Sequence, residues 1–246
     1  MEIAIRPPLN TKLKKDFPDQ RYNLMNGLLE NKKIVIIGGT TGMGLSAARA
    51  FIDAGAKLVV MGKEEAGVKD AKALLGNNAI VICGDATLPS AAAAAVAACQ
   101  QHFGDFDGLY HVAGGSGRKM GDGALHEMTL EGWNKTIEWN LTSLMLSNQA
   151  AVKQLLALKK PGSILNMGSV LGMSPSPHFF STHAYATAKS AIIGFSKSVA
   201  AYYAKDSIRV NVIAPAVVKT QMAQRASTDK DILSFIKTKQ PLDGGR

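Results

Sequence analysis

The sequence has little cysteine, few aromatic residues and no long apolar run. Its 246 residues include 2 cysteines, Cys83 and Cys99, each in an apolar or Ala-rich setting and without a second cysteine at metal-ligand spacing. We therefore expect two free thiols, a reducing compartment and no metal site. No segment approaches the run of about 20 apolar residues that a membrane span needs, and residues 1–17 lack the apolar core of a secretory signal. These absences predict a soluble, cytoplasmic protein without a membrane partner.

Positive charge is the one excess in the composition. The formal net charge is +9, yet lysines and arginines are spread along the chain, and aromatic residues make up only 6%. A nucleic-acid interface gathers its basic residues into a patch or stripe. The charge therefore favours surface solvation and attraction for anionic ligands, and nucleic-acid binding is the least favoured interpretation.

From residue 32 onward, short apolar segments alternate with segments of helical composition. The expected strands are residues 32–39, 57–62, 79–85, 107–115, 162–169 and 208–215, and the expected helices are 44–56, 64–76, 89–104, 130–160 and a helix through Tyr185 to about residue 205. This alternation predicts βαβ units with right-handed crossovers. We expect a single α/β domain at residues 31–246, with a doubly wound parallel sheet in three α/β/α layers, after an irregular N-terminal extension at residues 1–30. Ligands of such sheets bind beyond the carboxyl ends of the strands.

Glycines gather between the first expected strand and the first expected helix, in the stretch IIGGTTGMGLS. Gly38, Gly42 and Gly44 have no Cβ atom, so the backbone can approach a pyrophosphate there, and the helix N-terminus supplies N–H groups and a positive partial charge. A tight turn without a ligand is the alternative. The position at the first strand-to-helix turn favours a dinucleotide site.

Tyr185 and Lys189 lie four residues apart in the stretch HAYATAKSA. On a helix this spacing advances about 400°, so the two side chains lie about 40° apart on one face, one turn above the other. A phenol and an ammonium are thereby held close together. An exposed helix face that happens to carry Tyr and Lys is the alternative, and only the surrounding motifs decide between them.

Four features of the sequence occur in the order typical of short-chain dehydrogenases/reductases. They are the pattern Gly38-x-x-x-Gly42-x-Gly44, Asn140, Ser169 and the pair Tyr185-x-x-x-Lys189. The chain resembles this family over residues 32–245, and within it the 3-oxoacyl-(acyl-carrier-protein) reductases. The resemblance implies a Rossmann-type fold, a nicotinamide dinucleotide and hydride transfer to or from a carbonyl/alcohol carbon.

The resemblance also implies a role for each of the four candidate catalytic residues. Tyr185 would be the general acid in reduction and the base in oxidation, but a free phenol has a pKa near 10. Lys189, together with an oxidised nicotinamide, would lower that pKa and hydrogen-bond the nicotinamide ribose. Ser169 would donate to the substrate oxygen, and Asn140 would hold a water that links the lysine to solvent. Each of the last three residues alone has a purely structural alternative.

The second expected strand suggests which dinucleotide is preferred. In the family an acidic residue at its end selects NAD, and a basic residue one place later favours the phosphate of NADP. Gly62 and Lys63 occupy these places, and Thr41 can also contact the phosphate, so the sequence favours NADP; Glu64 leaves NAD as the alternative. The residues expected at the cofactor are Gly38, Thr40, Thr41, Gly42, Met43, Gly44, Lys63, Asp85, Ala86, Ala113, Gly114, Tyr185, Lys189, Pro215, Val218 and Thr220.

Two departures from the family pattern stand out. His111 and Val112 replace two asparagines at the end of the fourth expected strand, and we expect a local rearrangement of hydrogen bonds there without loss of activity. The usual last helix and seventh strand have no counterpart, which suggests a truncated chain, or a sheet of six strands with an exposed edge. In the family these elements help to build the tetramer and to close the pocket. Their absence would therefore affect both the expected homo-oligomer, a tetramer or dimer, and the substrate lid near residues 221–240.

The leading hypothesis is an NADP(H)-preferring oxidoreductase for a carbonyl/alcohol pair, with a 3-oxoacyl thioester or another apolar ketone as the candidate substrate. The loop between Ser169 and Tyr185 is rich in apolar residues and would wall the substrate pocket. Arg118 and Lys119 could attract an anionic substrate or carrier, with a solvated loop as the alternative. The rival hypothesis is a non-catalytic dinucleotide-binding or scaffold protein, because of the two departures above.

Overall fold

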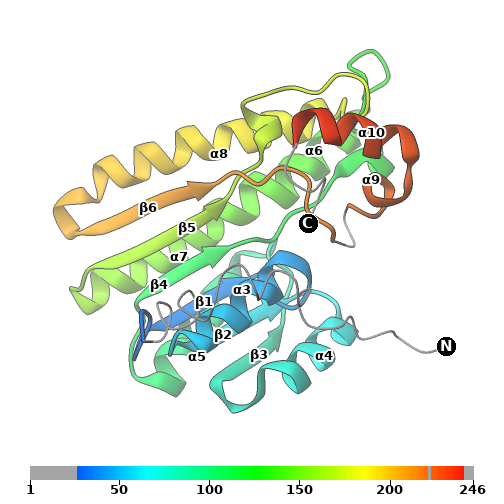
Figure 1. Cartoon of the computed structure of the whole chain (residues 1–246). Coiled ribbons are helices and arrows are strands. Elements are labelled where there is room, and N and C mark those ends of the chain that lie inside the picture. Colours follow the sequence, from blue (N-terminus) through cyan, green and yellow to red (C-terminus); the bar gives the residue numbers. More distant parts are fainter. Residues whose placement is uncertain (1–26, 221–222, 241–246) are drawn as a thin grey trace.

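The chain folds into a single α/β domain around one parallel sheet (Figure 1). The computed structural model describes residues 27–220 and 223–240. The strands are β1 (Lys33–Ile37), β2 (Lys57–Gly62), β3 (Ala79–Cys83), β4 (Gly108–His111), β5 (Gly162–Met167) and β6 (Ile208–Ile213). Their order in the sheet is β3-β2-β1-β4-β5-β6, and all pairs are parallel.

Helices connect successive strands and cover the sheet. They are α3 (Gly42–Asp53), α4 (Glu65–Leu75), α5 (Pro89–Phe103), α6 (Leu130–Ile137), α7 (Ser143–Leu158), α8 (His183–Tyr202), α9 (Gln224–Thr228) and α10 (Lys230–Lys239). Short helical turns are η1 (Gly76–Asn78), η2 (Gly117–Met120), η3 (Glu138–Thr142), η4 (Val170–Gly172) and η5 (Ala204–Asp206). Among the residues described, no helix is both long and apolar enough to cross a membrane.

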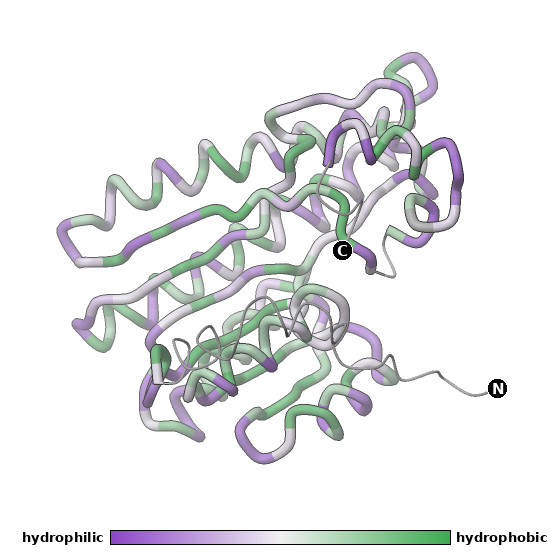
Figure 2. The backbone as a smooth tube through the Cα atoms, viewed as in Figure 1, coloured by the Kyte–Doolittle hydropathy of each residue, from purple (hydrophilic) through white to green (hydrophobic). Residues whose placement is uncertain are grey.

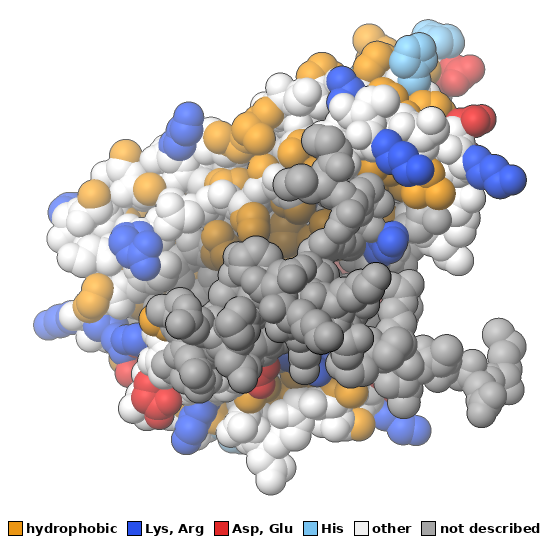
Figure 3. Space-filling model, viewed as in Figure 1, with side chains coloured by type: hydrophobic (Ala, Val, Ile, Leu, Met, Phe, Trp, Pro, Cys, Tyr) orange, Lys and Arg blue, Asp and Glu red, His pale blue; other side chains and the backbone are white. Residues whose placement is uncertain are grey.

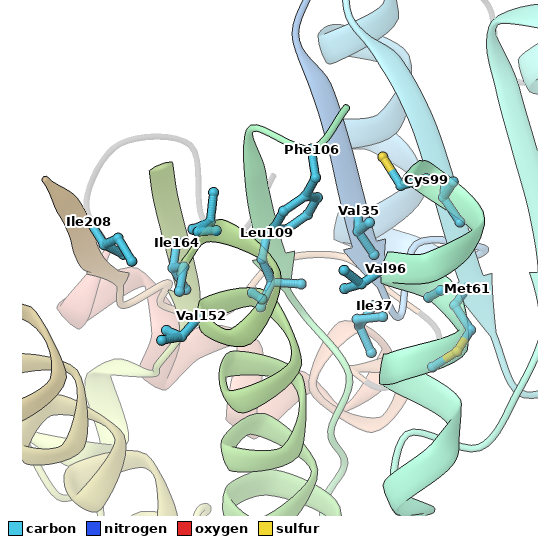
Figure 4. Packing of buried hydrophobic residues seen from close by; sticks show 14 of the residues in the cluster. Val35, Ile37, Met61, Val96, Cys99, Phe106, Leu109, Val152, Ile164 and Ile208 are labelled. Atoms are coloured by element: carbon cyan, nitrogen blue, oxygen red, sulfur yellow. The ribbon is translucent and has the colours of Figure 1, made fainter. Parts of the chain in front are cut away.

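The core lies in two layers, one on each face of the sheet. Successive strand residues point to opposite faces, so Val35 and Ile37 of β1 pack with α5 and α7, while Ile36 packs with α3 and α4. Figure 4 shows Val35 and Ile37 beside Val96 of α5. Strands covered on both faces are apolar along most of their length, as Figure 2 shows for β1 and β2.

The sheet reverses its order at β1, which pairs with β2 on one side and β4 on the other. Ligands of doubly wound sheets bind at such a switch point. β4 ends at His111 because the next two main-chain N–H groups, of Val112 and Ala113, both donate to the Ile37 carbonyl. The chain after β4 is thereby directed toward the β1–α3 turn.

The predicted alternation of strands and helices is confirmed, with ends that differ by a few residues. The expected helix 130–160 is one uninterrupted helical segment in which the π-helical turn η3 lies between α6 and α7. The sheet of the described residues has six strands, with β6 at one edge. Residues 1–26 of the predicted extension, and residues 221–222 of the predicted lid, lie outside the described residues.

Candidate active site

The β1–α3 turn forms a cradle of main-chain atoms. Gly38 has a φ of +86°, and a Cβ atom there would lie 2.5 Å from the Ala113 nitrogen. A Cβ atom at Gly44 would overlap the Gly38 carbonyl oxygen. Thr41 makes no side-chain capping bond to α3, and the first turn of α3 carries no acidic residue. The first amides of the helix therefore suit an anionic group such as a pyrophosphate.

Thr40 belongs to the predicted cofactor set, but its side chain points away from that cradle. It is 6% exposed, and a Cβ atom at Gly62 would overlap its hydroxyl oxygen. Thr40 therefore fills the space at the end of β2, and any contact that it makes with a cofactor comes from its main chain. The absence of an acidic residue at position 62 has a steric cause.

Lys63 and Asp85, both predicted at the cofactor, contact each other. Lys63 Nζ lies 2.9 Å from Asp85 Oδ2, with the lysine side chain 61% exposed. The other carboxylate oxygen accepts hydrogen bonds from the main-chain N–H and the hydroxyl of Thr87. Partial burial favours the neutral carboxyl, but the bonds from Thr87 and Lys63 outweigh it and lower the pKa of Asp85 to about 2. The predicted adenine contact of Asp85 stays a prediction.

The predicted catalytic residues Ser169, Tyr185 and Lys189 come together at the carboxyl end of β5. Lys189 Nζ lies 5.5 Å from the centre of the Tyr185 ring and donates to the Met167 carbonyl at 2.9 Å. The lysine is 3% exposed, and burial lowers its pKa to about 8. Helical spacing thus places an ammonium beside the phenol, as the sequence predicts.

The pKa of Tyr185 differs from the expectation. Burial raises it above its ordinary value, and hydrogen bonding with the Ser169 side chain opposes the rise. The expected lowering by Lys189 is not found in the chain alone, because the site that holds both groups removes water from the phenol as well as from the ammonium. Tyr185 is therefore protonated at neutral pH.

Asn140 lies in the π-helical turn η3 and is fully buried. Its amide nitrogen donates to the carbonyls of Gly115 and Thr136, at 2.7 and 2.9 Å, and its oxygen accepts from the Gly115 N–H at 3.2 Å. π-Turns within helices are frequent at functional sites. The Asn140 side chain thus holds the segment after β4, and the water that the family resemblance implies stays a prediction.

His111 forms the rearranged hydrogen-bond network that the sequence predicts. Its Nδ1 lies 3.0 Å from the Ser147 hydroxyl and its Nε2 lies 3.0 Å from the Ala113 carbonyl. Burial, followed by the charge of Lys189, lowers the pKa of His111 to about 3, although the bond to Ala113 opposes the shift. A neutral imidazole therefore ties β4 to α7.

Asp122 is a site residue that the sequence analysis missed. It is 1% exposed, and its two carboxylate oxygens accept the N–H groups of Ala184 and Tyr185, each at 3.0 Å. A carboxylate at a helix N-terminus satisfies free N–H groups and is stabilised by the helix dipole. Asp122 therefore anchors the first turn of α8 and with it the Tyr185 backbone.

Gly172 was missed for a similar reason. A Cβ atom there would lie 2.7 Å from the Lys189 carbonyl carbon and 2.7 Å from the Ser190 nitrogen. Only glycine lets η4, which follows Ser169, approach α8 this closely. No local motif marks either Gly172 or Asp122.

A cavity of about 980 Å³ lies beyond the carboxyl ends of β4, β5 and β6, next to the start of α3. The predicted residues that line it are Met43, Gly114, Asn140, Ser169, Tyr185, Lys189, Pro215, Val218 and Thr220. Those outside its lining are Gly38, Thr40, Thr41, Gly42, Gly44, Lys63, Asp85, Ala86 and Ala113. Gly42 adjoins it, because its Cβ position lies 3.5 Å from Thr220. His178 and His183 are exposed and do not line it.

A small apolar cluster closes one side of the cavity. Ala226 of α9 and Ile232 and Ile236 of α10 are buried against Phe179 and Phe180 of the loop before α8. In Figure 1, α9 and α10 lie near α6 and the start of α8, away from α4. Residues of α9 and α10, the described part of the predicted lid, thus contribute to the lining of the cavity; that they act as a lid stays a prediction.

The comparisons with known proteins agree with this geometry. A sequence profile of the family described as short chain dehydrogenase matches residues 32–231. The 2-(S)-hydroxypropyl-CoM dehydrogenase 3 of Xanthobacter autotrophicus is 32% identical over 205 residues, 82% of this chain and 77% of that protein. The 3-oxoacyl-(acyl-carrier-protein) reductase of Vibrio cholerae is 30% identical over 202 residues, 82% of this chain and 80% of that protein.

Solved structures show the same fold. The crystal structure of gox2181 is 25% identical, with a TM-score of 0.79 over 87% of this chain and 82% of that chain. The chain therefore belongs to the short-chain dehydrogenase family. It is an NAD(P)-dependent oxidoreductase of that family with a Rossmann fold.

Proposed function

We propose that this chain is an NADP(H)-preferring oxidoreductase that interconverts a carbonyl and an alcohol, with Asn140, Ser169, Tyr185 and Lys189 in its active site. The observation that carries the proposal is the convergence of Ser169, Tyr185 and Lys189 in one cavity beside the β1–α3 cradle. The cradle fits a dinucleotide, because the first turn of α3 has no side-chain cap and no acidic residue, and because Gly38 and Gly44 let the turn pack closely against Ala113 and against itself. The residues expected to hold the dinucleotide are those that form the cradle and the lining next to it.

Each residue has a chemical task that its surroundings support. When bound, the dinucleotide supplies or accepts the hydride at the substrate carbon. Tyr185, kept protonated by burial, donates its proton to the carbonyl oxygen in reduction. The Ser169 hydroxyl donates a hydrogen bond to the same oxygen, where negative charge develops. Lys189 stabilises the phenolate that remains after proton transfer.

The preference for NADP rests on the end of β2. Gly62 offers no carboxylate to repel a ribose phosphate, and Lys63 stands next to it with most of its side chain exposed. Its ion pair with Asp85 is solvent-accessible, and such pairs contribute at most about 1 kcal/mol. A phosphate can therefore compete with Asp85 for the Lys63 ammonium.

The substrate class follows from the walls of the cavity and from the relatives. Phe180 and Phe235 line the cavity, and Phe179 packs against Phe235; this aromatic side suits an apolar ketone. One relative is named as a 3-oxoacyl-(acyl-carrier-protein) reductase and another as a 2-(S)-hydroxypropyl-CoM dehydrogenase. A 3-oxoacyl thioester is accordingly the first substrate to test. Assembly into a homotetramer or dimer and a cytoplasmic location stay predictions.

Replacement of Tyr185 tests the function directly. Tyr185→Phe removes the proton donor, and we expect kcat for NADPH-dependent reduction of ketones and 3-oxoacyl thioesters to fall by about 10²–10⁴-fold. NADPH affinity, measured by fluorescence, should stay within about twofold. Tyr202→Phe makes the same chemical change at the exposed end of α8 and should leave both quantities unchanged.

Two outcomes would contradict this proposal. If Tyr185→Phe retains the wild-type rate, the proton donor is another group. If the wild-type chain is stabilised by NADPH but turns over none of these substrates, the non-catalytic dinucleotide-binding alternative is favoured.

A further inference from the structure

Cationic side chains line the cavity that holds Tyr185. Besides Lys189, these are Arg118, Lys119, Arg225 and Lys239, and no aspartate or glutamate occurs among the described residues of the lining. Lysine and arginine side chains stand beside hydrophobic ones over the α9–α10 region (Figure 3). The phosphates of a dinucleotide belong at the β1–α3 cradle, whereas these four cations come from η2, α9 and α10. The four cationic side chains on this side of the cavity are therefore available to bind a group other than the dinucleotide phosphates.

Two of the cations converge on a single acceptor. Arg118 Nη2 lies 3.4 Å and Arg225 Nη2 lies 2.6 Å from the carbonyl oxygen of Phe179. The two like charges repel each other: burial, followed by the charge of Arg225, lowers the pKa of Arg118, and Asp122 opposes this effect. Both arginines are exposed, so water screens part of this repulsion, and an anion bound between the two guanidinium groups would reduce it further.

Most donors of these two guanidinium groups remain available. Each guanidinium has five N–H donors, and the hydrogen bonds described for each use one nitrogen and the same carbonyl. Within residues 27–220 and 223–240, neither arginine lies within ion-pair distance of a carboxylate. The pair can therefore accept an oxyanion without breaking an existing ion pair.

Aromatic rings support the cations. The Arg225 guanidinium lies 5.7 Å from the centre of the Phe180 ring, and Lys239 Nζ lies 5.8 Å from that of Phe235. Phe179 packs against Phe235 at 5.3 Å between ring centres. The cavity thus combines an apolar wall with a charged rim, which complements a molecule with an apolar body and an anionic end.

We propose that Arg118 and Arg225 form a subsite for an oxyanion of the substrate: a carboxylate, sulfonate or phosphate that an apolar body separates from the reacting carbon. Planar guanidinium groups bind such oxygens through charge-assisted hydrogen bonds. The anion also reduces the repulsion between the two arginines. This inference rests on the proposed function, because it defines the substrate class of the same cavity.

Matched substrate pairs test the subsite kinetically. 5-Oxohexanoate and its methyl ester differ by one charged group, and the acetoacetyl thioester of 4′-phosphopantetheine differs from that of pantetheine by one phosphate. We expect the anionic member of at least one pair to have a KM lower by about tenfold or more. A lower KM for the anionic member of the first pair indicates that the subsite binds an anionic group of the substrate itself. A lower KM for the anionic member of the second pair indicates that it binds a phosphate of the carrier.

Variants connect this preference to the two arginines. In the double variant Arg118→Gln/Arg225→Gln the KM difference should shrink to about twofold or less, while kcat with the neutral ester stays within about threefold. Arg209→Gln removes the same charge from an exposed residue near the start of β6, at the end of the strand away from the cavity, and should keep the full difference. Equal KM values for both members of each pair in the wild-type chain overturn the inference.

A binding measurement separates this inference from the proposed function. Calorimetric titrations with hexanoate, hexanesulfonate and uncharged hexanamide, at saturating NADPH, need no turnover. Tighter binding of either anion that is lost in the double variant supports the subsite even if no ketone is reduced, in which case only the proposed function fails. Equal binding of all three ligands overturns the subsite, whatever the turnover.

Discussion

The two halves of the sheet build their parts of the site in opposite ways. Around β1 and β2 the site is made by leaving side chains out, since a Cβ atom at Gly38, Gly44 or Gly62 would meet another part of the chain. Around β5 and α8 it is made by buried side chains, Tyr185 and Lys189, which residues distant in the sequence hold in place. The first half suits a ligand common to the whole family, and the second suits chemistry that depends on exact side-chain position.

Among changes that leave the candidate catalytic residues in place, the largest effect is expected where the half around β5 and α8 depends on one distant carboxylate. Asp122→Ala removes both acceptors from the first turn of α8, and we expect a loss of about 1–2 kcal/mol in stability and a fall of about 10–100-fold in kcat, because the Tyr185 backbone loses its anchor. NADPH affinity should change little, since the β1–α3 cradle is untouched. Thermal melting, fluorescence titration and steady-state kinetics measure the three quantities.

Two further variants sharpen that prediction. Asp122→Asn keeps acceptor oxygen at the same place and should recover part of kcat. Asp229→Ala removes a similar carboxylate cap from α10, and should lower stability without a comparable fall in kcat. If Asp122→Ala leaves kcat unchanged, Tyr185 is positioned without it.

At the junction of the two halves, the expected effect is on stability and its pH dependence instead of on the reaction rate. A histidine in the unfolded chain titrates near 6.5, whereas burial keeps the pKa of His111 at about 3. Between these values the unfolded chain binds a proton that the folded chain does not, so stability falls as the pH is lowered, by about 1.4 kcal/mol per unit from this group.

Unfolding by urea at several pH values between 6.5 and 4 measures this dependence. In His111→Asn, which restores the family residue, the slope should decrease by about that amount. His126→Asn, at an exposed histidine, should leave the slope unchanged. An identical slope in His111→Asn and in the wild type would show that other groups cause the acid sensitivity.

The smallest effect is expected in the half of the sheet around β1 and β2, where we propose that the dinucleotide binds. Lys63→Ala should reduce the ratio of NADPH to NADH affinity by about 3–10-fold, because an exposed ammonium contributes modestly to binding a phosphate. Lys69→Ala removes the same charge from the exposed face of α4 and should preserve the ratio. If Lys63→Ala leaves the ratio intact, the choice of dinucleotide is made elsewhere.

The fold was predictable because its signals are local. Apolar strands such as residues 57–62 are bounded by turns, and their alternation with helices defines a parallel sheet. The glycine pattern and the Tyr185–Lys189 spacing are also local, and both were predicted correctly as structural features. The π-turn at Asn140 was not, because the sequence around it has ordinary helical composition.

The rest of the site depends on contacts between distant residues. Asp122 lies 63 residues before Tyr185 in an irregular glycine-rich loop, where no periodicity indicates a partner. The pairing of Lys63 with Asp85 joins the ends of neighbouring strands, and it changes the surroundings of two residues that the family resemblance assigned to separate tasks. Burial likewise reverses the expected direction of the Tyr185 pKa shift, because sequence spacing gives distances but not the loss of water.

The contact between Thr40 and position 62 restricts how the chain can acquire a different cofactor. An aspartate or glutamate introduced at position 62 brings a Cβ atom into the space that the Thr40 hydroxyl occupies. The acidic change alone therefore damages the turn before it can select NAD. We therefore expect an acidic residue at position 62 to be tolerated better together with a smaller residue at position 40 than alone.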